Sequence, residues 1–87
     1  MKTIYKFSVP KMEQVLHMPV GYKILTVAYQ EDILCLWAEL DPSLLARPIP
    51  VIISIYGTGW DMPEDPGNYI GTVQTVDGFV WHVFEKL

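Results

Sequence analysis

Turn-forming residues divide this chain into short apolar segments, and this pattern limits the fold more than any other feature. Seven prolines and six glycines are spread along 87 residues, and β-branched and aromatic side chains fill the stretches between them. Runs of roughly five to nine such residues between turn signals are typical of strands. We therefore predict one all-β domain over residues 1–87. It is a small antiparallel sandwich or partly open barrel of six to seven strands, with at most one short helical turn.

Alternation of side chains and turn signals gives the expected elements. Glu31-Asp32 and Asp77-Gly78 have the spacing of hairpin turns, and Asp-Gly is the stronger signal of the two. Asp41 followed by Pro42 is typical of the start of a helical turn. The segment Ile33–Leu40 is almost continuously apolar, which favours a strand that is buried on both faces. The expected strands are 2–9, 14–18, 23–30, 33–40, 51–56, 69–76 and 79–85.

The chain carries more apolar surface than a domain of its size can easily hide. Hydrophobic residues make up 51% of it and charged residues 18%, whereas about 25% of residues are charged in ordinary domains. A chain this short buries only roughly 60–65% of its unfolded surface on folding. We therefore predict self-association into a homo-oligomer.

Charge and composition exclude several function classes. Six basic against ten acidic residues give a net charge of −4, which does not suit binding to a DNA duplex. Cys35 is the only cysteine, so no internal disulfide forms, and with two histidines the chain offers too few zinc ligands. We expect Cys35 to be a buried, inert thiol. We expect no metal, no cofactor and no membrane segment, and a cytoplasmic protein without a signal peptide.

Two glycine-threonine pairs are the sharpest local features. Gly57-Thr58 and Gly71-Thr72 each lie beside aromatic residues, and we expect the two segments to be neighbouring strands. Aromatic rings there would stack on a planar group, while hydroxyls and backbone amides would contact phosphates. Trp37 is out of step with Leu36 and Ala38, so it faces a ligand or a subunit interface. The candidate ligand-binding residues are Trp37, Tyr56, Gly57, Thr58, Gly59, Trp60, Tyr69, Gly71 and Thr72.

Simpler interpretations of the same residues stay open. The glycines also fit plain tight turns, and Tyr56 and Tyr69 also fit a cross-strand aromatic pair. No basic residue lies between Arg47 and Lys86, so positive charge for a phosphate must come from the amino-terminal half or a second subunit. His17 and His82 would form an acid–base pair only if the fold brought them together. We predict no catalytic residues and no enzyme activity, and we rank a small hydrolase last.

Several segments together resemble a family of small phage and prophage proteins of about 85 residues. The resemblance is carried by Cys35-Leu36-Trp37-Ala38 with Asp41-Pro42, by Ile55-Tyr56-Gly57-Thr58-Gly59, by Pro66-Gly67-Asn68-Tyr69-Ile70-Gly71-Thr72, and by His82-Val83-Phe84-Glu85. Met18-Pro19 and Lys23-Ile24-Leu25-Thr26-Val27 fit it as well, so it covers nearly the whole chain.

The resemblance implies a bacteriophage protein that acts in the cytoplasm of the host bacterium. Phages carry small counter-defence proteins that disable host immunity. Some of these are sponges, which sequester the cyclic nucleotide messengers of CBASS-type immunity without cleaving them. The expected function is therefore binding and sequestration of a nucleotide immune messenger. The acidic charge departs from this pattern, so the alternative is a protein-interaction module that inhibits a host protein through an apolar and acidic surface.

Overall fold

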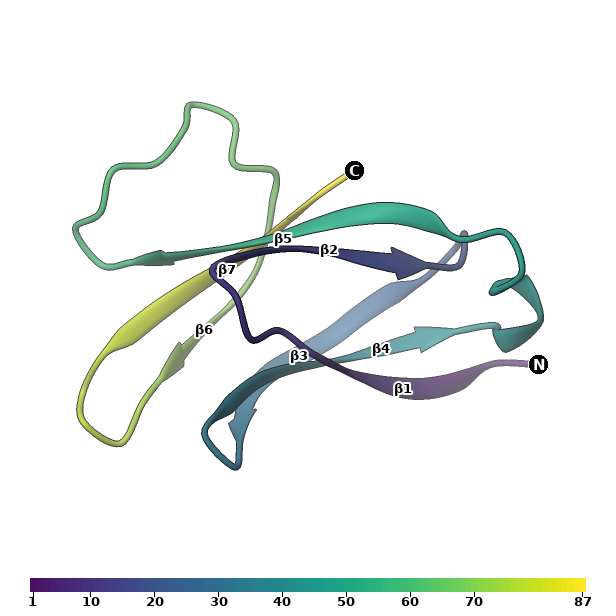
Figure 1. The fold of residues 1–87 in the computed structure, drawn as a ribbon, viewed down its shortest axis with the longest axis horizontal. Coiled ribbons are helices and arrows are strands. Elements are labelled where there is room, and N and C mark those ends of the chain that lie inside the picture. Colours follow the sequence, from purple (N-terminus) through teal and green to yellow (C-terminus); the bar gives the residue numbers. More distant parts are fainter.

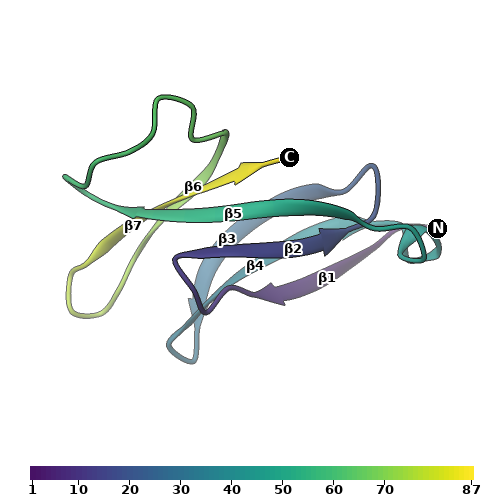
Figure 2. The same cartoon turned by 45° about the horizontal axis from the view of Figure 1, so that its top comes forward.

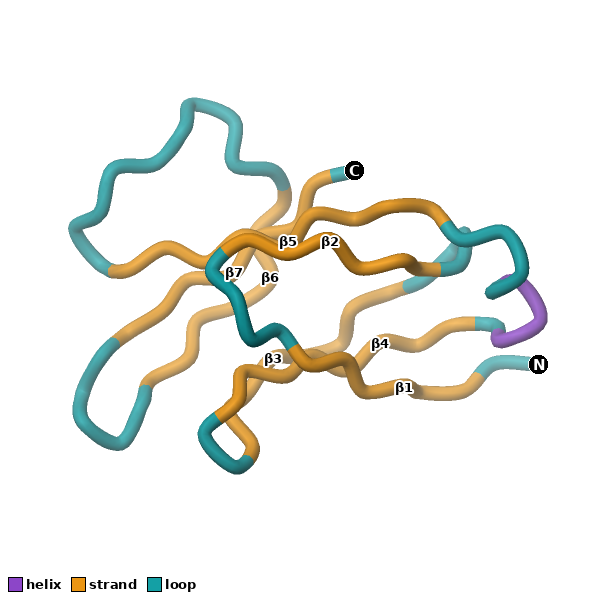
Figure 3. The backbone as a smooth tube through the Cα atoms, in the orientation of Figure 1, coloured by secondary structure: helices purple, strands orange, loops and turns teal.

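The computed structural model describes all 87 residues as two antiparallel β-sheets and one short helical turn (Figures 1 and 3). The all-β prediction is confirmed, and every strand ends within two residues of its expected bounds. The elements are β1 (Thr3–Ser8), β2 (Glu13–Met18), β3 (Lys23–Gln30), β4 (Ile33–Leu40), the 3₁₀ turn η1 (Pro42–Leu44), β5 (Ile49–Gly57), β6 (Asn68–Gln74) and β7 (Val80–Lys86).

The strands form two layers with different numbers of strands. Sheet A has the order β1-β4-β3, and sheet B has the order β2-β5-β7-β6. At one side of the sandwich β3 and β6 meet, and a Cβ atom on Gly71 would lie 3.0 Å from Cγ2 of Val27. Sheet B is the longer layer. The end of β5 and the β6–β7 hairpin extend past sheet A (Figures 1 and 2).

The core lies between the inner faces of the two sheets. Leu34, Leu36 and Ala38 of β4 are each at most 4% exposed, and they pack against buried residues of sheet B. On the outer face of β4, Cys35 is 3% exposed, and Trp37 is half-buried. The inner face of β4 is therefore buried as predicted, whereas on the outer face Cys35 is buried but Ile33 is 44% exposed, so the prediction of burial on both faces is confirmed only in part. The buried cluster comprises Val9, Leu16, Met18, Leu34, Leu36, Ala38, Val51, Ile53, Ile55, Val73 and Val83.

The β3–β4 and β6–β7 hairpins have turns of different length and backbone conformation. Glu31 and Asp32 both have positive φ, 53° and 65°, which is the left-handed backbone of a two-residue turn whose twist matches the strands. In the β6–β7 hairpin, the Gly78 N–H donates to the Thr75 oxygen at 3.0 Å, and Gly78 has a φ of 91°. The Thr75 N–H donates to the Phe79 oxygen, so the turn comprises residues 76–78, one residue more than the sequence predicts. The strand β6 ends at Gln74.

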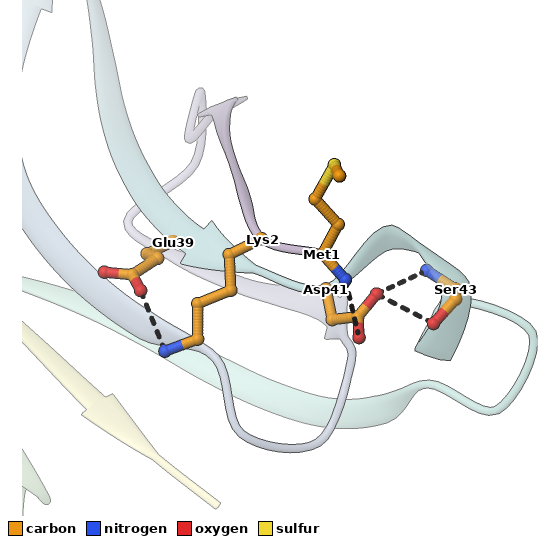
Figure 4. A network of polar contacts seen from close by, with 5 residues as sticks. All are labelled: Met1, Lys2, Glu39, Asp41 and Ser43. Carbon is orange, nitrogen blue, oxygen red and sulfur yellow. Dashed lines mark hydrogen bonds and ion pairs between the residues drawn. The ribbon is translucent and has the colours of Figure 1, made fainter.

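The predicted helical turn is present, and its cap also contacts the chain terminus (Figure 4). Asp41 accepts hydrogen bonds from the Ser43 hydroxyl at 2.7 Å and from the Ser43 N–H at 3.0 Å. These bonds, the hydroxyl first, hold the pKa of the Asp41 carboxyl below its usual value. The amino group of Met1 lies 3.8 Å from the same carboxylate, and Lys2 pairs with Glu39 at 3.0 Å. The carboxylates of Glu39 and Asp41 thus hold the start of β1 beside β4.

Tyr22 links the two layers at the end of the sandwich opposite the hairpins. Its hydroxyl donates to Oε2 of Glu85 on β7 at 2.6 Å. Burial first, and then the hydrogen bond to this carboxylate, raise the pKa of Tyr22 far above its usual value. The folded protein therefore holds the phenol proton more tightly than the unfolded chain does.

This link gives an expected pH dependence. A raised folded-state pKa stabilises the fold below the ordinary tyrosine value of 10.0, and that stabilisation is lost as the pH rises above it. We expect the free energy of unfolding to fall between pH 10 and 11, and Tyr22→Phe to flatten this decline. Urea titrations at pH 8, 10 and 11 measure it. Equal slopes in the two proteins would contradict the assignment to Tyr22.

Candidate functional site

Four polar side chains form a continuous hydrogen-bonded row on the outer face of sheet B. Thr58 Oγ1 lies 2.8 Å from Nε2 of His82, and Thr72 Oγ1 lies 3.0 Å from Nδ1 of the same ring. The hydroxyl of Tyr69 lies 2.5 Å from Thr72 Oγ1. The row Thr58–His82–Thr72–Tyr69, called the hydroxyl–imidazole row below, joins three of the predicted site residues through a histidine.

Strand register explains how this row forms. His82 on β7 is opposite Tyr56 on β5 and opposite Thr72 on β6. The prediction that the two glycine-threonine segments lie on neighbouring strands is wrong, because β7 lies between β5 and β6. The tight β6–β7 hairpin places β7 beside β6, and the other edge of β7 then pairs with β5. His82 therefore stands between the two threonines.

An aromatic row lies next to the hydroxyl–imidazole row on the same face. The Phe84 ring packs edge-on against Tyr69, with centroids 5.5 Å apart, and against Tyr56 at 5.8 Å. A direct Tyr56–Tyr69 pair, the alternative from sequence, is wrong for the same reason: Phe84 of β7 stands between them. The side chain of Tyr69 is 60% exposed. This face therefore offers an open ring beside three hydroxyls and an imidazole.

The connection from Thr58 to Gly67 forms a wide arch between β5 and β6 (Figure 1). Residues of this arch border a hollow. The hollow has a volume of about 290 Å³, and Tyr56, Ser54, Asp65 and Lys86 are among its lining residues. The Lys86 ammonium donates to the Asp65 carbonyl oxygen at 3.0 Å and lies 3.5 Å from its carboxylate. Lys86 is the one basic side chain that lines this hollow.

The glycines and Trp60 of the first motif lie at the other side of β7. The backbone N–H of Trp60 donates to the backbone oxygen of Gly57 at 3.1 Å, and Gly59 has the positive φ of 86° that this turn requires. The Trp60 ring then packs against Trp81 with centroids 5.3 Å apart. Trp81 is on the inner face of β7, so Trp60 does not join Tyr56 and Tyr69.

The structure places two further predicted residues away from the hydroxyl–imidazole row. Gly71 is at a β-bulge and faces Val27 of the other sheet, so it is a packing position rather than part of the outer face. Trp37 lies on the outer face of sheet A, opposite Lys6 and Thr26. His17 pairs with Pro50, six positions along β5 from the partner of His82, which is about 20 Å of strand. The two histidines therefore form no pair.

His82 and Phe84 were missed as site residues, although the sequence carries a signal for them. Val80, His82 and Phe84 share one face of β7 by simple alternation, and the Asp-Gly hairpin sets His82 opposite Thr72. The predicted two-residue turn would pair Thr72 with Val83, however, so the longer loop of the structure is what brings Thr72 opposite His82. What the sequence does not give is the partner of the other edge of β7, so Thr58 could not be placed beside His82.

Comparison with known proteins gives a family. The sequence profile described as a domain of unknown function, DUF7352, matches residues 1–87, so the chain belongs to this family. No curated protein and no solved structure matches the chain significantly. The structure contains no group of three or more His, Cys, Asp or Glu side chains arranged to hold a metal ion, and none of its helices has the length and apolar character to span a membrane.

Proposed function

We propose that this DUF7352 protein binds a nucleotide-type messenger on the outer face of sheet B and holds it without cleaving it. The observation that carries the proposal is the hydroxyl–imidazole row beside the aromatic row of Tyr56, Phe84 and Tyr69. Aromatic side chains on a strand surface stack on bases, at about 1–3 kcal/mol for each base. The hydroxyls and the imidazole of the neighbouring hydroxyl–imidazole row supply donors and acceptors for the polar edges of the same ligand.

The polar row suits binding better than bond cleavage. In serine- and cysteine-type hydrolases, a carboxylate or amide orients the histidine while its other nitrogen activates the nucleophile. Here Nδ1 of His82 meets the neutral hydroxyl of Thr72, and Nε2 meets Thr58. A hydroxyl does not stabilise an imidazolium as a carboxylate would. The hydroxyls can instead rotate to donate to a ligand or accept from it.

The negative charge of the ligand's phosphates should place them near the basic side chains of this face. Lys86 lines the hollow beside Tyr56, and a protonated His82 would donate from both ring nitrogens. A phosphate beside Lys86 would meet the one basic side chain of this hollow. The resemblance to phage proteins makes a cyclic nucleotide immune messenger of the host the proposed ligand, and its removal from the effector the proposed effect. Self-association stays a prediction, and a second subunit would add basic residues from the amino-terminal half.

The test is a ligand panel on the intact protein. We expect one of cyclic di-AMP, cyclic di-GMP, cyclic GMP–AMP or cyclic AMP to raise the melting temperature and to be recovered unchanged after heat denaturation. Calorimetry should then show that Tyr69→Ala and Thr72→Val each weaken binding by about 1–3 kcal/mol, through lost stacking and a lost hydrogen bond.

Thr26→Val is the matched control for Thr72→Val. It removes the same hydroxyl from an exposed strand position on the outer face of sheet A, so nucleotide affinity should be unchanged. Recovery of a hydrolysed product would contradict sequestration. Absence of a shift with every nucleotide, in a protein that circular dichroism shows to be folded, would contradict the proposed ligand class.

A further inference from the structure

Sheet B extends past sheet A at the end that carries the β6–β7 hairpin (Figures 1 and 2). Three aromatic side chains border a hollow at this end. The hollow measures about 380 Å³ and is lined by Gly57, Thr58, Trp60, Gly78, Phe79, Val80 and Trp81. On the inner-facing side of β7 and the residue before it, the exposed fraction rises from 0% at Val83 to 59% at Phe79, because sheet A no longer covers this end. Trp60 is 52% exposed. Trp81 still packs against the core, but core packing does not account for Trp60 and Phe79.

The rings are held in a fixed arrangement. Trp60 and Trp81 meet at 82°, so their planes form two walls of a corner, and Phe79 stacks near Trp81 at 25° with centroids 6.0 Å apart. A Cβ atom on Gly57 would come within 2.7 Å of the Trp60 ring, so the glycine is what lets the indole lie against the strand. This is a preformed aromatic corner rather than a flexible apolar tip.

The charge around the corner is one-sided. Asp61 follows Trp60 and Asp77 precedes Gly78, so each carboxylate is next in sequence to a lining residue. Asp61 makes no ion pair. No basic residue lies between Arg47 and Lys86, and Lys86 is engaged with Asp65 on the outer face. Asp77 accepts a hydrogen bond from Thr75 and lines a different hollow, so Asp61 is the free carboxylate next to the corner. A positive group arriving here would meet aromatic faces and no competing cation.

We propose that this aromatic corner receives an arginine side chain from an exposed basic segment of a partner protein. A guanidinium stacks on indole faces through a cation–π contact and keeps its N–H edges free for a carboxylate, which matches the corner and the Asp61 that follows Trp60. The site is separate from the nucleotide face. It uses the inner-facing side of β7, and only Thr58 borders both.

The three tryptophans allow a direct test by ¹H–¹⁵N NMR of their indole signals. Titration of the whole protein with acetyl-Gly-Arg-Gly-amide should shift the Trp60 and Trp81 signals, while Trp37 on sheet A serves as the internal reference. The peptide with norleucine in place of arginine should shift none of them. Raising the salt from 50 to 500 mM should weaken the arginine effect, because exposed carboxylates are screened.

Substitutions distinguish binding at the aromatic corner from nonspecific hydrophobic binding. Trp60→Ala should weaken peptide binding about three- to tenfold, and Met62→Ala, an exposed apolar residue of the same loop that does not line the hollow, should leave it unchanged. Equal shifts with norleucine would overturn cation recognition. Trp60 and Trp81 shifts that depend on protein concentration without peptide would assign the corner to a second copy of the chain and overturn the proposal, as would the absence of any shift.

Discussion

Replacing Leu36 with alanine is expected to lower the free energy of unfolding by about 3–5 kcal/mol. Leu36 is 0% exposed at the centre of sheet A, in register with Phe7 on one side and Val27 on the other. The substitution removes buried apolar atoms and leaves a cavity that two facing sheets cannot close. A domain of this length has roughly 4–13 kcal/mol of stability in total. The variant should therefore be close to unfolded at 37 °C, as urea titration monitored by circular dichroism would show.

Leu25→Ala is the matched control for this prediction. Leu25 is on the neighbouring strand β3, at the register shift between Ile24 and Thr26, and it is 43% exposed. The same chemical change there should cost less than about 1 kcal/mol, since the removed atoms already contact water. If both variants lost the same stability, the core would not be centred on β4.

Gly67→Ala is expected to be the next most costly change, at about 2–4 kcal/mol. A Cβ atom at Gly67 would lie 2.2 Å from the carbonyl oxygen of Glu85, and the backbone there has a φ of +94°. The obstacle is main chain at the end of the β6–β7 pairing, where Glu85 is opposite Asn68, so it cannot move aside as a side-chain tip would. The long connection before β6 should detach from β7, exposing the hollow around Lys86.

Gly21→Ala separates the cost of the positive φ from the cost of the clash with the Glu85 backbone. Gly21 has a similar φ of +82°, but a Cβ atom there would meet nothing within 4 Å. It should therefore cost only about 1–2 kcal/mol from the left-handed backbone. The difference between the two variants in melting temperature measures the contact with Glu85. A Gly67→Ala protein as stable as Gly21→Ala would show that the connection moves freely.

The fold could be predicted because its signals are local. Alternation in β1 and β7, the Asp-Gly turn and the Asp41-Pro42 cap each depend on residues within a few positions of one another, and each is present in the structure. The strand β4 and the burial of its inner face also followed from its continuous apolar run, but its outer face is only partly buried. Local signals end where the chain turns, which is why the extra residue in the loop at Thr75 was missed.

The candidate site could be predicted only in part because it depends on which strands pair. The residues Tyr56, Thr58, Tyr69 and Thr72 were identified from composition and turn chemistry, but their common neighbour is β7, which follows them in the chain. Trp37 was grouped with them because it is out of step with Leu36 and Ala38, and Gly71 because Gly71-Thr72 repeats the Gly57-Thr58 pair. Sheet order puts Trp37 on the other layer, and the β-bulge turns Gly71 toward Val27.

The pairing of β1 with β4 and of β2 with β5 fixes the order in which this chain can fold during synthesis. The first 18 residues form the edge strands of both sheets, yet their partners are made only later, from Ile33 to Gly57. At about 5–20 residues per second, β1 waits for some seconds with its backbone unpaired. The start of the chain carries Lys2, Lys6, Lys11, Pro10 and Pro19 beside its apolar residues. Lysines and prolines at such positions oppose pairing with other chains, so the amino terminus is protected during the interval when it has no partner.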